Sequence, residues 1–499
     1  MRFDQENKRL LLFFATALLL LGLWLRYSCV WFAYPLTVNW DEERLLGNVF
    51  RMLHFGSFNP QFFNYPSLVL YLNGALFWLL GTKLAVVDYF VAGRLLTVSM
   101  ALVTMVLLTY LAWRYFSPTV GVLSLLFIST SFMHVRFTTV IRVDPYVALW
   151  ALCAYGAALA LHKQGPRLSY YIVGGLFVGL ATSSKYTAFL TCLPIVVAHV
   201  ALYLQGRTSL FAKGIFIAGL CSLIAFFVTT PFAILDNANF MEALRFEANH
   251  YAKGHPGCEA AGATSFGLYL SWLFNTGFGV LPSLLALVGL CTLFKRDKTM
   301  ALLAASFPVA LLLFVGQHRV YFPRNVVGMV PFLAIFAALG TKQLFEMAQA
   351  KMERRFAYVS VAALLLLSVS STTIRSFEYR RSCNLPDTRW VASCWLRNRL
   401  PKAATIGREQ YTPPIEKMTK RYNVQPLGLM GIGRNPAAAV KMDYLILSSQ
   451  DHMRVLKDPK KFAQEASVYR SIFAQGTLLA RFEPKDGKYS GPVISVYQL

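Results

Sequence analysis

Apolar runs separated by short polar segments fill the first three quarters of the chain. Most runs are about 17 to 25 residues long, which is enough for a helix to cross the ~30 Å hydrocarbon core of a bilayer. Lys and Arg gather in alternate short loops, and loops on the inner side of a membrane carry an excess of these residues. Placing those loops inside predicts eleven membrane spans, near residues 10–33, 90–112, 119–138, 145–161, 170–184, 187–204, 214–235, 267–294, 299–316, 325–341 and 356–374.

The first span follows a basic flank and has no Ala-x-Ala-like cleavage site, so we interpret it as a retained helix and not a signal peptide. Two further helices are predicted to lie along the outer interface. Residues 66–80 are apolar, but a membrane crossing there would move every later loop to the opposite side of the membrane. Asn39 and Glu42 have the spacing of a capping box. The residues after them form one apolar stripe, which is typical of an interfacial helix: Leu45, Leu46, Val49, Phe50 and Leu53.

The pattern changes after about Arg375, where charged residues become frequent and no run of span length remains. Residues 386–401 predict an amphipathic helix with Asp387 as its N-cap. Residues 444–449 predict a buried strand, and residues 477–499 predict two strands joined by a turn around Asp486 and Gly487. We therefore divide the chain into a transmembrane domain, residues 1–375, and a soluble domain on the outer side, residues 376–499.

Composition supports this division. Charged residues make up 14% of the 499 residues, against roughly a quarter in soluble proteins, and the mean hydropathy is +0.48. The predicted fold is an all-α polytopic membrane protein of about eleven transmembrane helices with interfacial helices, followed by a small C-terminal soluble α/β domain. We expect it in the inner (cell) membrane. Membrane lipids are expected partners of the basic outer domain, and nucleic acid is not. Cys383 and Cys394 fall on the outer side, where they could form a disulfide or remain two free thiols.

Three consecutive acids, Asp41, Glu42 and Glu43, follow the first span in a chain of formal charge +24. Acids in a first helical turn are favoured by the helix dipole, which is one explanation for them. A second acid, Asp144, precedes Pro145, and this order is typical of helix entry with Asp at the N-cap. Both acids lie on the predicted outer face, so we expect them at one depth and facing one cavity. Ionisable groups near a membrane commonly have a function.

Four basic residues also fall on the outer side, which such residues usually avoid. They are Arg142, Lys185, Arg319 and Arg324. Each has a structural alternative. Arg142 could pair with Asp144, and Lys185 could extend from the end of a span toward the headgroups. Arg319 and Arg324 could hold a loop against anionic lipid.

Several blocks of the sequence resemble, in order, the lipid-carrier-dependent glycosyltransferases, which include the protein O-mannosyltransferases and the aminoarabinose transferases of lipid A. The first is the Asp-Glu pair after span one. The others are "NYPSLVLYLNGALFWLLG", "GRLLTVSMALVT", "RFTTVIRVDPYVAL", "GLFVGLATSSKYTAFLTCLPIVV", "YFPRNVVGMVPFLAIFAALG" and "DTRWVASCWLRNRLP". The resemblance covers nearly the whole chain, and the ordered set is more specific than any single block.

This resemblance implies a GT-C fold and transfer of a sugar from a polyprenyl phosphate to an acceptor hydroxyl of a protein, lipid A or a glycan, usually with inversion. It assigns the general base to Asp41, with Glu42 beside it, and Asp144 matches the second acidic position. The leaving phosphate gains charge, so cations should lie against it. We expect Arg142, Lys185, Arg319 or Arg324 to supply them. Many members have a lysine where this chain has Tyr65, which would offer the phosphate only a hydroxyl.

The predicted loop between the spans at 214–235 and 267–294 is long for a connector. It could cover the cavity, with His250 and His255 near the acceptor, although loop histidines are usually solvated. No Cys/His spacing resembles a metal site, and this chemistry requires no cofactor. A divalent ion bound by Asp41, Glu42 and a histidine is left open.

Two other classes of function are considered. A transporter would place charged or helix-breaking residues near the bilayer midplane, whereas this chain keeps the middle of most spans uncharged. A non-catalytic glycan-binding membrane subunit is the second alternative. The Asp41→Asn variant separates the classes, because only an enzyme would lose turnover.

Overall fold

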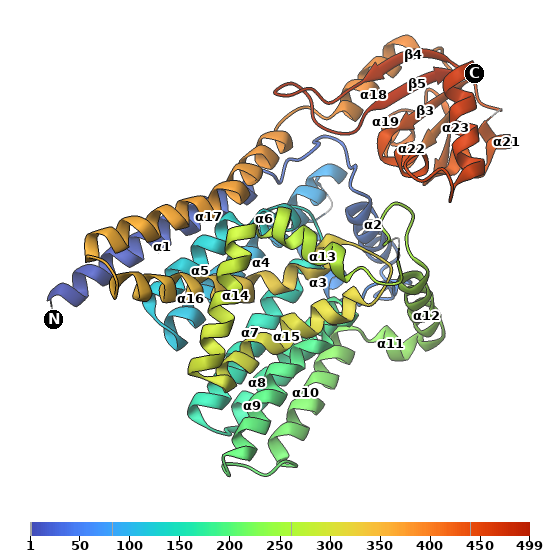
Figure 1. Cartoon of the computed structure of the whole chain (residues 1–499). Coiled ribbons are helices and arrows are strands. Elements are labelled where there is room, and N and C mark those ends of the chain that lie inside the picture. The colour runs from blue at the N-terminus through green and yellow to red at the C-terminus, as the bar shows by residue number, and fades with distance from the viewer. Residues whose placement is uncertain (1, 82, 261, 440) are drawn as a thin grey trace. The chain divides into compact units, whose positions relative to one another are not determined.

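The computed structural model describes residues 2–81, 83–260, 262–439 and 441–499 (Figure 1). The chain divides into two compact units. The first contains Met1–Val30 and Arg44–Glu378, and the second contains Trp31–Glu43 and Tyr379–Leu499. Helix α2 (Trp40–Phe55) begins in the second unit and continues into the first, and α17 (Arg354–Cys383) begins in the first and ends in the second.

The described part of the first unit is helical apart from connecting segments. Its other helices are α1 (Arg2–Tyr27), α3 (Leu68–Leu80), α4 (Val86–Tyr115), α5 (Pro118–Thr130), α6 (Phe132–Phe137), α7 (Asp144–Gln164), α8 (Leu168–Ser184), η1 (Tyr186–Cys192), α9 (Leu193–Leu204), α10 (Lys213–Thr229), α11 (Phe232–Leu235), α12 (Asn237–Lys253), α13 (Phe266–Trp272), η2 (Leu273–Gly277), α14 (Val280–Arg296), α15 (Lys298–Gly316), η3 (Pro323–Met329) and α16 (Val330–Gln349).

Apolar helices coincide with all eleven predicted spans. Within the described residues, seven helices are long and apolar enough to cross a membrane, and the bent pair α13–α14 makes an eighth. The other three predicted spans coincide with α5, α8 and α10, which have 13 to 17 residues. The chain is therefore a multi-pass membrane protein. Helix α3, at 13 residues, is also short, and its predicted interfacial position stays a prediction.

Several predicted spans are interrupted, and two of the breaks have a clear local cause. The predicted span at 267–294 bends by 114° between η2 and α14. Gly279 has φ +98° at the bend, a conformation that favours glycine. The predicted span at 119–138 breaks at Ser131, whose hydroxyl accepts from the backbone N–H of His134 and begins α6. A continuous helix was therefore the wrong expectation at both places, because hydropathy does not register these local stops.

Small residues let the helices of the first unit pack closely. A Cβ atom at Gly289 would clash with the carbonyl oxygen of Phe336, and one at Gly340 would clash with that of Leu285. Close backbone approach at small residues is a usual source of helix association in membranes. Helices α14 and α16 are held together in this way. Helices α1 and α17 lie side by side in Figure 1, with the rings of Trp24 and Phe377 5.3 Å apart.

The second unit contains a five-stranded sheet in the order β2-β1-β3-β5-β4. Strands β1 (Thr405–Glu409), β2 (Asn423–Gly428) and β3 (Tyr444–Ser448) are parallel, and β4 (Thr477–Phe482) and β5 (Ile494–Gln498) are antiparallel neighbours. The three predicted strands are confirmed. The helices are α18 (Thr388–Arg399), α19 (Ile415–Met418), α20 (Gly431–Arg434), α21 (Pro436–Ala439), α22 (Ser449–Leu456) and α23 (Ala463–Gln475).

Side chains of β3 alternate between two apolar cores, as the period of a strand requires. Leu445 and Leu447 pack into the core that also contains Tyr469 of α23. Ile446 packs into the other core with Leu396 of α18. The sheet therefore has helices on both faces. Asp387 accepts a hydrogen bond from the backbone N–H of Arg389, which confirms it as the N-cap of α18. Cys383 and Cys394 are free thiols, so no disulfide joins them.

Candidate active site

A buried ion pair joins α7 to the end of α8 in the first unit. Lys185 Nζ lies 2.6 Å from Asp144 Oδ1, and their side chains are 9% and 5% exposed. Lys185 does not extend toward headgroups, because its side chain is enclosed. Asp144 begins α7, whereas Val143 occupies the N-cap position. The predicted capping role of Asp144 was therefore wrong, and its carboxylate forms the ion pair with Lys185 instead.

Asn325 of η3 completes the environment of the lysine. Its side-chain oxygen accepts a second hydrogen bond from Lys185 Nζ, at 2.8 Å. Its side-chain nitrogen donates to the hydroxyls of Tyr269 at 3.0 Å and Tyr251 at 3.4 Å. Tyr269 also accepts from the backbone N–H of Phe322 at 3.2 Å. One amide thus links the ammonium group to two tyrosines from α12 and α13.

The neighbouring charges include Arg324, whose guanidinium lies 4.3 Å from the ring centroid of Phe322. Burial raises the pKa of Tyr251 to about 12, and the positive charge of Arg324 and the bond from Asn325 oppose that rise. The negative charges of Glu247 and Asp144 contribute to it. Tyr251 is therefore a neutral hydrogen-bonding group within the field of both Arg324 and Asp144.

Aromatic rings gather at the end of α12. The rings of His250 and His255 are 5.2 Å apart, and His255 lies 5.4 Å from Phe322. Tyr251 lies 5.9 Å from His318. The predicted loop is mostly the helix α12, and its end meets the segment that carries Arg324. The structure thus brings both predicted histidines and Arg324 to one cluster that borders the lysine network.

The other predicted phosphate-binding residues are also in the first unit. The Arg142 guanidinium lies 5.6 Å from the ring of Phe137. The Nε of Arg319 is buried without a hydrogen-bond partner among the described residues, while its carbonyl accepts from Ala260 at 2.9 Å. Tyr65 packs against Phe62, with ring centroids 6.2 Å apart.

Asp41 and Glu42 lie in the first turn of α2, and this turn belongs to the second unit. The Asn39 side-chain oxygen accepts from the backbone N–H of Asp41 at 3.2 Å, which confirms the predicted helix start. Glu42 is buried. Since Asp144 belongs to the first unit, the expected convergence of Asp41 with Asp144 stays a prediction.

Three residues of the lysine network were not predicted from the sequence: Asn325, Tyr251 and Tyr269. Asn325 follows Arg324 directly, and Tyr251 follows His250, so both adjoin predicted positions. Asparagine and tyrosine carry no formal charge at neutral pH, so an unusual position of a charged residue does not point to them. Tyr269 has no such signal, because it lies within an apolar run.

A cavity of about 520 Å³ lies between α12 and the segment after α2. Its described lining includes neither predicted histidine and consists of Arg44, Gln61, Phe62, Phe63, Asn64, Asn239, Glu242, Ala243 and Phe246. Aromatic rings combined with amide and carboxylate groups suit a polar ligand with an apolar face. Among the described residues, no group of three or more His, Cys, Asp or Glu side chains could hold a metal ion.

Residues 73–234 match the model of the dolichyl-phosphate-mannose-protein mannosyltransferase family. The structure matches ArnT from Cupriavidus metallidurans bound to undecaprenyl phosphate, with a TM-score of 0.59 at 16% identity over 97% of each chain. The chain has the GT-C glycosyltransferase fold. A second match is the oligosaccharyltransferase AglB from Archaeoglobus fulgidus in complex with an inhibitory peptide and a dolichol-phosphate. Its TM-score is 0.59 at 12% identity, over 93% of this chain and 71% of that one. No curated protein sequence matches the chain.

The solved structures show the fold of the chain, and the family match covers residues 73–234 of it. The matched residues 73–234 include Asp144 and Lys185, so the ion pair lies within the part of the chain that the family model describes.

Proposed function

We propose that the chain transfers a sugar from a polyprenyl phosphate to an acceptor hydroxyl, at the outer face of the cell membrane and with inversion. The C-terminal domain would then be extracytoplasmic. The match to a family described by its dolichyl-phosphate-mannose donor supports this donor class. So do two structures of the same fold that contain undecaprenyl phosphate or dolichol-phosphate.

The single observation that carries the proposal is the position of the Lys185 ammonium. A lysine has three N–H donors, and Asp144 and Asn325 accept from two of them. The third can donate to an oxygen of the donor phosphate. Because the carboxylate and the amide fix Nζ in place, little side-chain freedom would be lost when the phosphate binds.

Guanidinium groups supply the remaining positive charge for the leaving phosphate. Arg324 borders the lysine network, and the buried Nε of Arg319 keeps a donor for an incoming anion. We assign the same role to Arg142, and Tyr65 would add one hydroxyl. These donors act most strongly on the charge that develops on the bridging oxygen in the transition state.

Asp41 acts as the general base, with Glu42 and Asp144 orienting the acceptor or tuning the base. The acceptor oxygen attacks the anomeric carbon as the bond to the phosphate oxygen breaks. The polyprenyl phosphate leaves with the bonding electron pair, and the acceptor proton passes to the Asp41 carboxylate. A single displacement of this kind inverts the anomeric centre. Lysine and arginine supply the positive charge, so no step requires a metal.

The acceptor would approach by way of α12. The cavity beside this helix has the aromatic and amide lining that a sugar or peptide surface would use, and His250 and His255 lie at the end of the same helix. This arrangement suits a protein, lipid A or glycan acceptor equally.

Asp41→Asn in the full chain tests the proposal. Transfer from undecaprenyl-phosphate mannose, or undecaprenyl-phosphate aminoarabinose where the wild type prefers it, should fall about 10²- to 10⁴-fold. Binding of undecaprenyl phosphate should persist. Asp88→Asn is the matched control, because Asp88 is also an acid in the first turn of a helix. Equal turnover in the two variants would remove Asp41 as the base.

A further inference from the structure

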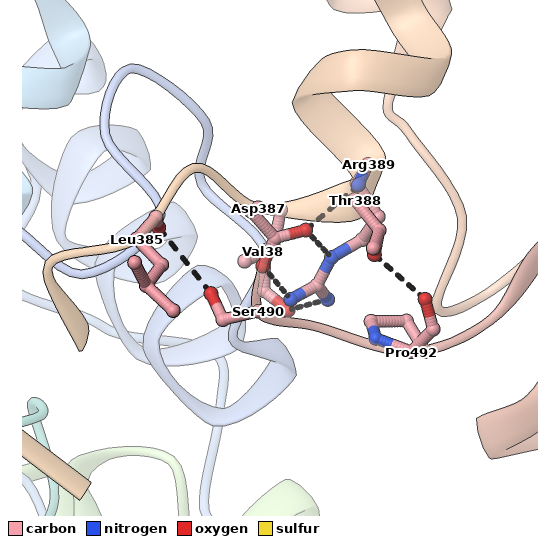
Figure 2. Close-up of polar contacts among 7 residues, drawn as sticks. All are labelled: Val38, Leu385, Asp387, Thr388, Arg389, Ser490 and Pro492. Atoms are coloured by element: carbon pink, nitrogen blue, oxygen red, sulfur yellow. Dashed lines mark hydrogen bonds and ion pairs between the residues drawn. The ribbon is translucent and has the colours of Figure 1, made fainter. Parts of the chain in front are cut away.

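Arg389 and Asp387 form a second buried ion pair, in the second unit (Figure 2). Arg389 Nε donates to Asp387 Oδ1 at 2.8 Å, and Nη2 donates to Oδ2 at 2.7 Å. The side chains are 4% and 0% exposed. This two-point geometry fixes the plane of the guanidinium.

The loop between β4 and β5 holds the start of α18 in place. The Thr388 hydroxyl donates to the carbonyl of Pro492 at 2.6 Å, and the Thr388 backbone N–H donates to that of Ser490 at 2.7 Å. Asp387 is also the N-cap of α18. Arg389 therefore projects from a helix end whose position several independent bonds determine.

The remaining nitrogen of the fork contacts the segment that precedes α2. Arg389 Nη1 donates to the carbonyl of Val38 at 3.4 Å, as Figure 2 shows. A second contact lies on the other side of Asp41, where Lys417 Nζ is 3.2 Å from Glu43 Oε2. Arg389 and Lys417 thus contact the chain on both sides of Asp41, at Val38 and at Glu43. The charge of Asp41 is one of the causes, after burial, Arg454 and Asp451, that set the raised pKa of Tyr411.

We propose that Arg389 is a positioning residue for Asp41. The C-terminal domain, through Arg389 and Lys417, holds residues 31–43 so that the first turn of α2 presents its carboxylate in one orientation. Arg389 touches neither donor nor acceptor in this role. The consequence for catalysis rests on the proposed function of Asp41, whereas the holding of the segment does not.

Arg389→Lys is the informative variant. An ammonium group still neutralises the buried Asp387, but it cannot bond both carboxylate oxygens and the Val38 carbonyl. Hydrogen exchange of the full chain in nanodiscs should show the amides of residues 31–43 exchanging about threefold to tenfold faster, as expected for one lost hydrogen bond. The amides of β1 and β3 should exchange as in the wild type. Turnover should fall by a similar factor with an unchanged KM for the donor.

Arg399→Gln is the control, because Arg399 lies on the same helix and is exposed. The charge swap Glu43→Lys with Lys417→Glu provides a second test: each single variant should speed exchange over residues 31–43, and the pair should restore it. Asp41→Asn combined with Arg389→Lys should be no slower than Asp41→Asn alone, since both act through one carboxylate.

Unchanged exchange over residues 31–43 in Arg389→Lys would overturn the proposal, as would faster exchange with full turnover. An active Asp41→Asn variant would instead show that the proposed base is wrong. Hydrogen exchange of the Arg389→Lys variant would then still show whether the C-terminal domain holds residues 31–43.

Discussion

Two buried ion pairs among the described residues, Lys185 with Asp144 and Arg389 with Asp387, differ in their surroundings. Arg389 donates from two guanidinium nitrogens to Asp387 and from the third to the carbonyl of Val38. Lys185 donates to Asp144 and Asn325, which leaves one N–H of the ammonium for a further acceptor. Each nitrogen of the Arg389 guanidinium therefore has an acceptor within the second unit. We propose that the ammonium of Lys185 instead takes one more acceptor, an oxygen of the donor phosphate.

A buried charge can stabilise the fold, or it can in addition bind a ligand, and the two pairs illustrate these two roles. Removing one partner of a buried pair is costly in either case, because the remaining charge is left in a poorly polarisable environment. Under the proposed function, only the Lys185 pair should also contribute to binding a phosphate. Stability and ligand affinity can therefore be measured separately on the two pairs.

The largest expected effect follows from breaking the pair in the first unit. Lys185→Met leaves the Asp144 carboxylate buried without its cation, which should lower the free energy of unfolding by about 3–5 kcal/mol. Urea unfolding in mixed micelles measures it. Arg296→Met is the control, since Arg296 and Glu346 form an exposed pair worth about 0–1 kcal/mol. Equal losses in the two variants would show that burial of the first pair carries no extra stability.

Phosphate affinity gives the next largest effect and separates the pairs directly. Lys185→Gln should weaken binding of undecaprenyl phosphate by about ten- to a hundredfold, the value of one charge-assisted hydrogen bond. Arg389→Lys should leave this affinity unchanged. Titration of the purified full chain with the lipid measures both. If Arg389→Lys weakened binding as much as Lys185→Gln, the assignment of phosphate binding to the Lys185 pair alone would be wrong.

Replacing both members of the first pair should separate stability from binding within one site. Lys185→Met combined with Asp144→Leu removes both charges, so most of the lost stability should return, to within about 1–2 kcal/mol of the wild type. Undecaprenyl phosphate binding should not return. Recovery of both properties would show that the ammonium has no part in holding the phosphate.

The sequence predicted the features that depend on neighbouring residues. The spans, the Asp387 cap and the three strands follow from hydropathy and local hydrogen bonding. The sites depend on contacts between distant segments: Lys185 is 41 residues from Asp144 and 140 from Asn325, and Arg389 is 351 residues from Val38. A single sequence contains no signal for such pairings. Charged residues in unexpected places pointed to Lys185, Asp144 and Arg324, but the uncharged Asn325 gave no such indication.

The smallest expected effect concerns a third buried polar group, the carboxylates Glu409 and Asp451 of the second unit. Tyr469 and the backbone N–H of Ser448 donate to Glu409. Burial, and then the charge of Asp451, raise the pKa of Glu409 well above its usual value, and burial raises the pKa of Asp451 to about 6. The folded state therefore binds more protons than the unfolded state. Its stability should rise as pH falls from 7 toward 5, through the folded pKa of Asp451, by on the order of 1 kcal/mol.

Below pH 6.5 one group opposes part of this gain. Burial lowers the pKa of His452 to about 4, so the unfolded state takes up a proton there that the folded state does not. Urea unfolding of the full chain, followed by proteolytic cleavage within residues 379–499, measures the dependence at each pH. Glu409→Gln should reduce the rise, whereas His452→Gln should make it steeper below pH 6.5. A wild-type stability that fell between pH 7 and 5 would mean that the two acids are ionised in the fold, and that this pair, unlike the two ion pairs, holds negative charge without a buried cation.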